Sequence, residues 1–271
     1  MPELPEVETT RKGISAAILN QTVKSVIVRD YRLRWLIPKS LEQQLPRQTI
    51  TQINRRGKYL LLQTATHCLI IHLGMSGHLR IVKQDTPVTK HDHVDIVFNN
   101  KLALRYNDPR RFGAVLWTDQ DPLKHERLRN LGVEPLDDEF NAQHLYDNSR
   151  SRSIAVKSFI MDGKLVVGVG NIYACESLFM AGIDPRKAAN KISMKRYERL
   201  CEAIKSVLTK AIKAGGTTLQ DFKNSDGKPG YFAQELKVYG RAGEPCGVCG
   251  RKIKSLVIAQ RNTFWCSGCQ R

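Results

Sequence analysis

The hydrophobic residues follow a helical spacing at the start of the chain and a strand-like spacing after it. Val7, Ile14 and Ile18 fall on one face of a helix predicted over residues 3–20, and Pro5 suits its first turn. From residue 22 to about residue 118 the apolar runs are short, several alternate with polar residues, and turn residues separate them. This pattern predicts an antiparallel β-sandwich or barrel.

Beyond about residue 151 the spacing is helical again. Residues 197–212 carry one apolar face, and Gly215 and Gly216 form a stop signal directly after it. The acidic stretch Glu134–Glu139 indicates a linker. We therefore expect an N-terminal sandwich domain (1–132), a linker (133–150), a mainly helical domain (151–238) and a cysteine-rich unit (239–271).

Four cysteines near the C-terminus have the spacing of a metal site. Cys246 and Cys249 form one C-x2-C pair, Cys266 and Cys269 form another, and sixteen residues separate the pairs. Four thiolates leave no open coordination position, so the spacing predicts one structural zinc ion per chain. A redox or disulfide role is the alternative. The total of seven cysteines is odd, which favours a reducing compartment.

The net charge of the chain indicates which kind of molecule it binds. Its formal net charge is +17 and its basic residues are spread along the sequence, which favours a folded protein that binds a polyanion. A merely solvated basic surface is the alternative. No apolar stretch approaches the about 18 residues of a membrane span, and the start of the chain lacks a secretory signal. We expect a cytoplasmic, nucleoid-associated protein with no membrane partner.

The second residue carries a candidate chemistry. Removal of Met1 would leave Pro2 with a secondary amine, and an α-amino group has a pKa of roughly 8, so part of it is neutral and nucleophilic near neutral pH. Attack of this nitrogen on an aldehyde-like carbon gives a cationic iminium ion, which suits elimination on a sugar. A frayed chain end without chemistry is the alternative.

The chain as a whole resembles the formamidopyrimidine-DNA glycosylase (Fpg) family. The resemblance rests on ordered motifs along the full length and on the cysteine-rich end. The motifs are Pro2-Glu-Leu-Pro-Glu-Val7, Arg55-Arg-Gly-Lys58-Tyr59, His72-Leu-Gly-Met75-Ser-Gly77, Lys90-His-Asp-His93, Asp108-Pro-Arg110-Arg-Phe112-Gly113, Val167-Gly-Val-Gly-Asn171-Ile-Tyr173 and Ser225-Asp-Gly-Lys-Pro-Gly-Tyr-Phe232.

This resemblance implies a fold and a reaction. The fold is an α+β multidomain protein, with an N-terminal antiparallel β-sandwich and flanking helices, then a helix-two-turn-helix domain that ends in the four-cysteine zinc finger. The chain would act as a monomer on double-stranded DNA bound between the domains. It would excise oxidised purines, namely 8-oxoguanine and formamidopyrimidines. Pro2 would attack C1′, and the resulting Schiff base would pass through β and δ elimination at the abasic site.

The resemblance also assigns roles to individual residues. Glu3 becomes the general acid and Glu6 a supporting residue, although both also fit as plain first-turn helix acids. The remaining assignments follow the motifs. They are Lys58 beside the lesion; His72, Lys157, Asn171, Arg261 and Arg110 for DNA binding; Met75, Arg110 and Phe112 as the wedge that replaces the extruded nucleotide; and Ser225, Gly227, Lys228, Pro229, Gly230 and Tyr231 in a lid.

Several of these positions have simpler interpretations from the residues alone. Met75 and Phe112 also fit as core residues. Lys58 also fits as a solvated lysine, and Arg261 as an ordinary turn arginine. Two other functions also stay open. One is the endonuclease VIII branch of the superfamily, which prefers oxidised pyrimidines, although Leu4 favours Fpg. The other is a non-catalytic zinc-ribbon regulator, which gives no reason for Pro2 and Glu3.

Overall fold

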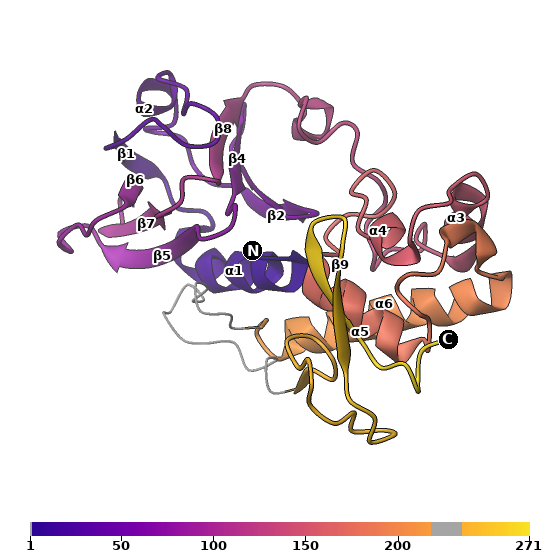
Figure 1. The fold of residues 1–271 in the computed structure, drawn as a ribbon. Helices are drawn as coiled ribbons and strands as arrows, with labels where there is room; N and C mark the ends of the chain where they lie inside the picture. Colours follow the sequence, from indigo (N-terminus) through magenta and orange to yellow (C-terminus); the bar gives the residue numbers. More distant parts are fainter. Residues whose placement is uncertain (1, 218–234) are drawn as a thin grey trace. The chain divides into compact units, whose positions relative to one another are not determined.

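The computed structural model describes residues 2–217 and 235–271, and these divide into two compact units. Among the described residues, the first unit comprises residues 2–129 and 214–217, and the second comprises residues 130–213 and 235–271. No helix in the described ranges is long and apolar enough to cross a membrane. The units are drawn in Figure 1, where colour follows the sequence.

The first unit begins with the predicted helix. α1 spans Leu4–Ile18, with Glu3 as its N-cap and Pro5 in its first turn. Its apolar face is fully buried and includes Val7 and Ile14. The helix contacts strands of both sheets of this unit, so its N-terminus is held firmly in place.

Two four-stranded antiparallel sheets form the body of this unit, as the alternating pattern predicted. A short helix, α2 (Leu41–Gln44), contacts β1, and a 3-10 turn, η1 (Pro122–Lys124), follows the last strand. The core of this unit is mainly aliphatic, with Phe98 and Tyr106 as buried aromatic residues and α1 contributing to it. One sheet has the order β1 (Val23–Val28), β6 (Asp92–Phe98), β7 (Leu102–Asn107) and β5 (His78–Lys83), and the other has the order β2 (Gln52–Arg56), β3 (Tyr59–Gln63), β4 (Cys68–His72) and β8 (Ala114–Thr118).

Strand pairing brings two loops of this unit together. The chain passes from β4 to β5 through residues 73–77 and from β7 to β8 through residues 108–113. β4 pairs with β8, so that His72 faces Ala114, and β5 pairs with β7, so that His78 faces Asn107. Both loops therefore start and end at neighbouring strands. Antiparallel pairing alone forces these two segments to run side by side.

Buried charges are paired in the sheet that contains β6 and β7. Arg105 is 1% exposed, and its guanidinium donates to both oxygens of Asp95 over 2.8 and 2.9 Å. Arg29 donates to the same carboxylate over 2.7 Å. Burial alone would raise the pKa of Asp95, but the hydrogen bonds and charges of Arg105 and Arg29 lower it below its ordinary value.

The second unit is helical and ends in a β-hairpin. α6 ends as predicted before Gly215, whose φ of +78° lies in the left-handed region. α5 contacts both α6 and the hairpin strand β10. The elements are α3 (Ala142–Ser149), α4 (Val156–Ile160), α5 (Asn171–Met180), η2 (Ala189–Lys191), α6 (Met194–Lys213), β9 (Lys254–Ile258) and β10 (Arg261–Trp265).

The segment boundaries expected from the sequence differ from these units. Residues 133–150, expected to be a linker, contain α3, which packs on α6 in the second unit. Phe140 and Leu145 are fully buried there, and the acidic residues around them masked this apolar signal. The cysteine-rich end shares a core with α5 through Cys175, Val238 and Ile253 instead of standing alone. Both segments therefore belong to the helical unit.

The first prediction concerns the buried ion pair. Asp95→Ala should lower the free energy of unfolding by about 3 kcal/mol, because Arg105 would stay buried with only the more distant carboxylate of Asp92, 3.6 Å away. Urea denaturation of the full chain measures this. Asp85→Ala removes an exposed carboxylate and should change stability by less than about 0.5 kcal/mol. Equal midpoints for both variants would contradict the prediction.

The pKa of Asp95 adds a pH dependence with a definite sign. Because the folded pKa is depressed, the stabilisation is present above the unfolded pKa of about 3.9 and is lost as pH falls below it. The wild-type chain should therefore lose stability more steeply than Asp95→Ala does as the pH falls below about 4.

Candidate functional site

The N-terminal residues of the first unit are buried together. Pro2 is buried, Glu3 is 3% exposed and Glu6 is 2% exposed. One oxygen of the Glu6 carboxylate accepts the Glu3 backbone N–H over 2.8 Å. The other oxygen accepts the backbone N–H of Thr217, also over 2.8 Å. Glu6 thus ties the start of α1 to a segment more than two hundred residues away in the sequence.

Glu8 differs from these two acids although it lies on the same helix. Its carboxylate pairs with Arg11 over 2.7 Å and with Arg55 over 3.2 Å. Burial alone would raise its pKa, but the hydrogen bonds and charges of Arg11 and Arg55 lower it. Glu8 therefore pins α1 to β2, whereas Glu3 and Glu6 are the acids next to Pro2.

Lys58 lies in the turn before β3, and His72 is the last residue of the neighbouring strand β4. Gly57 and Lys58 form the two-residue turn between β2 and β3, where Gly57 takes a φ of +57°. Tyr59 follows and faces His72 on β4, with the ring centroids 4.7 Å apart. The motif residues Lys58 and His72, which are fourteen positions apart in the chain, therefore share one edge of the unit.

The protonation of His72 follows from its surroundings. Burial, together with the positive charges of Lys58 and Arg34, lowers its pKa to about 4. Its Nδ1 accepts the backbone N–H of Gly74 over 3.0 Å, so the proton of the neutral ring is on Nε2. At neutral pH the side chain is therefore uncharged and carries a donor at Nε2.

The three motif residues on the paired loops are exposed. Met75 is 37% and Phe112 is 45% exposed, so neither is a core residue. Arg110 is exposed as well, and its guanidinium lies over the Phe112 ring at 5.1 Å from the centroid. An exposed thioether, cation and aromatic ring on two adjacent loops are suited to contact another molecule.

In the second unit, α5 and the C-terminal hairpin meet at Asn262. The side chain of Asn171, the first residue of α5, donates to the Asn262 carbonyl over 2.9 Å. Lys157 is 1% exposed, and its Nζ donates to the Thr263 hydroxyl over 2.7 Å. Lys157 therefore lies beneath the hairpin and orients it, while Asn171 lies at the helix N-terminus.

Arg261 is exposed at the tip of the hairpin. Ala259 and Gln260 form the turn, both with positive φ, and Arg261 is the first residue of β10, opposite Ile258. The two-residue turn and the register fix the direction of the Arg261 backbone. Asn171 and Arg261 thus lie on elements that are joined through Asn262.

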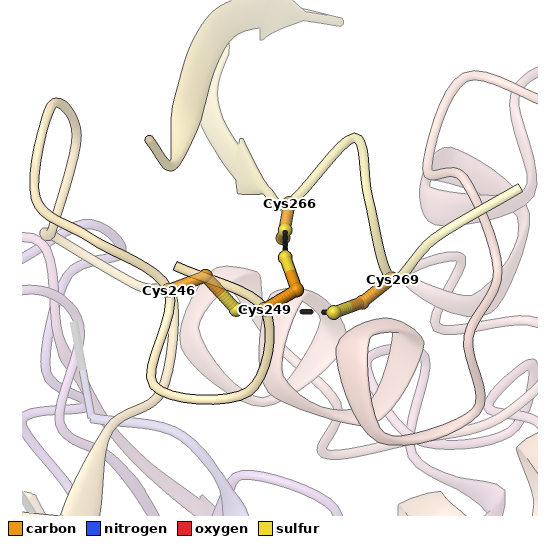
Figure 2. Close-up of side chains that lie close together, drawn as sticks. All are labelled: Cys246, Cys249, Cys266 and Cys269. Atoms are coloured by element: carbon orange, nitrogen blue, oxygen red, sulfur yellow. Dashed lines mark hydrogen bonds between the residues drawn. The ribbon is translucent and has the colours of Figure 1, made fainter. Parts of the chain in front are cut away.

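The four cysteines converge as their spacing predicted (Figure 2). Their sulfur atoms all lie within 4.8 Å of one another, with Cys246 and Cys269 separated by 3.8 Å and Cys249 and Cys266 by 3.3 Å. Four sulfurs around a tetrahedral zinc ion, each at about 2.3 Å from it, are about 3.8 Å apart. The arrangement fits a zinc-thiolate site. It is the one metal-type cluster found among the described residues, and His91-Asp92-His93 does not form another.

Sequence patterns missed several residues that organise these sites. Glu176 on α5 is 5% exposed, and its carboxylate accepts the backbone N–H groups of Lys237, Val238 and Tyr239 over 2.8–3.0 Å. An acid inside the apolar run of α5 was a signal, but its partners are some sixty residues away. The contacts of Thr217, Ser76 and Asp108 were missed for the same reason, although Ser76 and Asp108 stand in the motifs quoted above. The lid residues predicted at 225–231 lie outside the described residues.

The combination of a β-sandwich unit with a helical unit that ends in a four-cysteine hairpin defines a class of zinc-finger DNA glycosylases. The family models that match are the N-terminal domain of formamidopyrimidine-DNA glycosylase (residues 1–115), its H2TH domain (residues 131–223) and the zinc finger found in Fpg and IleRS (residues 243–271). The chain belongs to the formamidopyrimidine-DNA glycosylase family. The resemblance and the fold class inferred from the sequence are confirmed.

Individual relatives match along the whole chain. The formamidopyrimidine-DNA glycosylase of Saccharophagus degradans is 58% identical over 271 residues, with 100% of both chains covered. The Fpg structure from Thermus thermophilus is 35% identical, with a TM-score of 0.89 over 99% of this chain and 98% of that one. The Lactococcus lactis Fpg in complex with abasic-site DNA is 34% identical, with a TM-score of 0.91 over 99% of each chain.

The second prediction concerns His72. Its imidazole should titrate with a pKa of about 4, and long-range nitrogen–proton NMR spectra at pH 7 should show the proton on Nε2. Lys58→Met should raise this pKa, because it removes one of the two positive charges that lower it. A midpoint near the ordinary 6.5, or a proton on Nδ1, would contradict the assignment.

Proposed function

We propose that this chain excises oxidised purines from duplex DNA and then cleaves the abasic site. The observation that carries the proposal is the buried N-terminal group of Pro2, Glu3 and Glu6 in a chain of the Fpg family. After removal of Met1, the Pro2 nitrogen attacks C1′ of the damaged nucleotide while the N-glycosidic bond breaks. The base leaves with a proton supplied by Glu3 as general acid. The Pro2 nitrogen then loses its proton and the C1′–O4′ bond breaks, with O4′ taking up a proton, so that the opened sugar and Pro2 are joined by an iminium ion.

The covalent intermediate accounts for the second activity. An iminium at C1′ acidifies the C2′ protons, so loss of one of them expels the 3′ phosphate by β elimination. A second, δ elimination expels the 5′ phosphate, and hydrolysis frees Pro2. Glu6 supports this chemistry by holding the start of α1 and Thr217 in fixed positions. Lys58 holds the phosphate next to the lesion in this proposal.

Contacts to the DNA backbone come from both units in this proposal. The first unit supplies Lys58, Arg110 and the neutral Nε2–H donor of His72. The second supplies Asn171 at the N-terminus of α5 and Arg261 on the hairpin, with Lys157 holding the hairpin from below. One structural zinc ion, bound by Cys246, Cys249, Cys266 and Cys269, would stabilise the finger that presents Arg261.

Extrusion of the damaged nucleotide costs a few kcal/mol of stacking and pairing, so the space that it leaves must be filled. The exposed side chains of Met75, Arg110 and Phe112 support a role as the wedge. Residues Ser225–Tyr231 are proposed as a lid from their glycine and proline content alone. Because its substrate is chromosomal DNA, we place the enzyme in the cytoplasm, where it acts as a monomer.

Oxidised pyrimidines are a second candidate substrate. The Lactococcus lactis Fpg, 34% identical, has been solved with DNA that contains an oxidised pyrimidine, with a TM-score of 0.92 over 100% of both chains. Leu4 favours Fpg over the endonuclease VIII branch, so we expect oxidised purines to be preferred.

The third prediction tests the nucleophile. Borohydride should trap a covalent adduct between the chain without Met1 and a duplex with 8-oxoguanine opposite cytosine. The adduct should form faster than on a thymine-glycol duplex. Glu3→Gln should slow excision about 10²- to 10⁴-fold, because it removes the general acid, yet should still be trapped on a preformed abasic site. Gel electrophoresis of the adducts measures both. A mass spectrum that confirms loss of Met1, combined with no adduct on any substrate, would exclude the mechanism.

The fourth prediction tests the hairpin arginine. Arg261→Ala should weaken binding to all DNA sequences alike and reduce the slope of log Kd against log salt by about 0.9, as expected for one lost phosphate contact. Fluorescence anisotropy over a salt series measures this. Lys252→Ala is the matched control, because it removes one exposed charge from the same finger away from its tip. Equal slopes for the two variants would remove Arg261 from the phosphate site.

A further inference from the structure

The two loops that carry the wedge residues are joined by a buried group of polar side chains. Asp108 is fully buried, and its Oδ1 accepts the Ser76 hydroxyl over 2.7 Å. Its Oδ2 accepts the backbone N–H of Gly113 over 2.8 Å and the Tyr106 hydroxyl over 3.2 Å. One carboxylate therefore takes donors from the Met75 loop, from the far end of its own loop and from β7.

Ser76 connects the two loops at a second point. Its hydroxyl, while donating to Asp108, accepts the backbone N–H of Arg110 over 3.2 Å. Ser76 directly follows Met75, so this single oxygen links the backbone that carries the thioether to the backbone that carries the cation. The side chain is 6% exposed and shielded from water, which would otherwise compete for these hydrogen bonds.

The backbones of the loops also touch directly. A Cβ atom added at Gly74 would lie 2.4 Å from the Phe112 carbonyl carbon and from the Gly113 nitrogen. A Cβ atom at Gly113 would lie 1.7 Å from the Tyr106 oxygen. His93 holds the same region from β6, because its Nε2–H donates to the Asp108 carbonyl over 2.8 Å. The loops are packed too closely to move independently.

The protonation state of Tyr106 helps to keep the hydrogen bonds around Asp108 in place. Burial and the neighbouring charge of Asp108 raise the pKa of Tyr106 well above its ordinary value, so its hydroxyl remains a donor throughout the neutral range. Every donor that surrounds the carboxylate is thus retained at working pH. Burial of the Asp108 charge without these donors would be strongly unfavourable.

We propose that Ser76 and Asp108 are positioning residues for base extrusion, which lock the loops of Met75, Arg110 and Phe112 into one rigid wedge. Neither side chain needs to touch DNA. Their action is to keep three exposed side chains at fixed separations, so that the ordering cost of the wedge is met during folding and not when DNA binds. The inference rests on the wedge role proposed above for Met75, Arg110 and Phe112.

Ser76→Ala is the sharpest test, because it deletes one oxygen and leaves the backbone unchanged. The variant should slow insertion of the wedge about tenfold, because both hydrogen bonds of the Ser76 hydroxyl are lost. Stopped-flow fluorescence of 2-aminopurine placed beside 8-oxoguanine measures this step in the full chain. Cleavage of a preformed abasic site, which has no base to unstack, should slow less than about threefold.

Two further variants keep the test decisive. Ser149→Ala is a matched control, since the buried Ser149 hydroxyl donates to the Tyr146 carbonyl over 2.7 Å and accepts from Arg150 over 2.7 Å in the other unit. Ser149→Ala should lose a comparable amount of stability. It should leave the rates of wedge insertion and of abasic-site cleavage unchanged. If Ser76→Ala does not fold, Asp108→Asn replaces it, because the amide can donate to Ser76 Oγ and still accept from Gly113. Asp108→Asn should slow wedge insertion less than Ser76→Ala does, and it should again have little effect on cleavage of an abasic site.

Phe112→Ala separates failure of this inference from failure of the proposed wedge. A slow 2-aminopurine step for Phe112→Ala with a normal one for Ser76→Ala would overturn the positioning role and leave the wedge intact. Normal rates for both variants would exclude the wedge and the positioning role together. Equal losses on 8-oxoguanine and abasic duplexes for Ser76→Ala would also overturn the inference, because they indicate general damage to the fold.

Discussion

A carboxylate buried away from water must be surrounded by donors, and this requirement organises most of the molecule. Glu6, Asp95, Asp108 and Glu176 are each at most 5% exposed, and each takes donors from segments far apart in the sequence. Glu6 joins the start of α1 to Thr217, and Glu176 joins α5 to the chain that enters the finger. Loss of any one of these carboxylates would leave buried donors unpaired. Each carboxylate therefore determines how the segments that it joins pack together.

The same constraint changes the charge that the surface presents. Among the described residues, six carboxylates are buried but only two cations, Arg105 and Lys157. The formal net charge of +17 therefore understates the excess of positive charge that faces solvent. Internal acids stabilise the fold while the exposed cations are left to attract a polyanion. Fold stability and affinity for DNA thus depend on largely separate sets of charges in this chain.

The sequence predicted the elements whose signal is local. The helix after Pro2, the alternating strands, the stop at Gly215 and the cysteine pairs were all found, because each depends on neighbours a few residues apart. The helix α3 was missed because two buried residues, Phe140 and Leu145, lie among acids that resemble a linker. The roles of Ser76 and Asp108 could not be found, because their contact spans thirty-two residues and exists only once β4 pairs with β8 and β5 with β7.

Because His72 is neutral, a phosphate contact from it would depend on salt differently from a contact made by a lysine or an arginine. A lysine or arginine at a phosphate displaces counterions, so its contribution weakens as salt rises. An uncharged imidazole donates one hydrogen bond without adding charge, and its contribution depends far less on salt. The pKa of His72 is lowered to about 4 by burial and by Lys58 and Arg34, so the surrounding cations themselves keep the ring neutral. In the proposed function, His72 would therefore give a directional contact that positions DNA, beside the charged contacts that attract it.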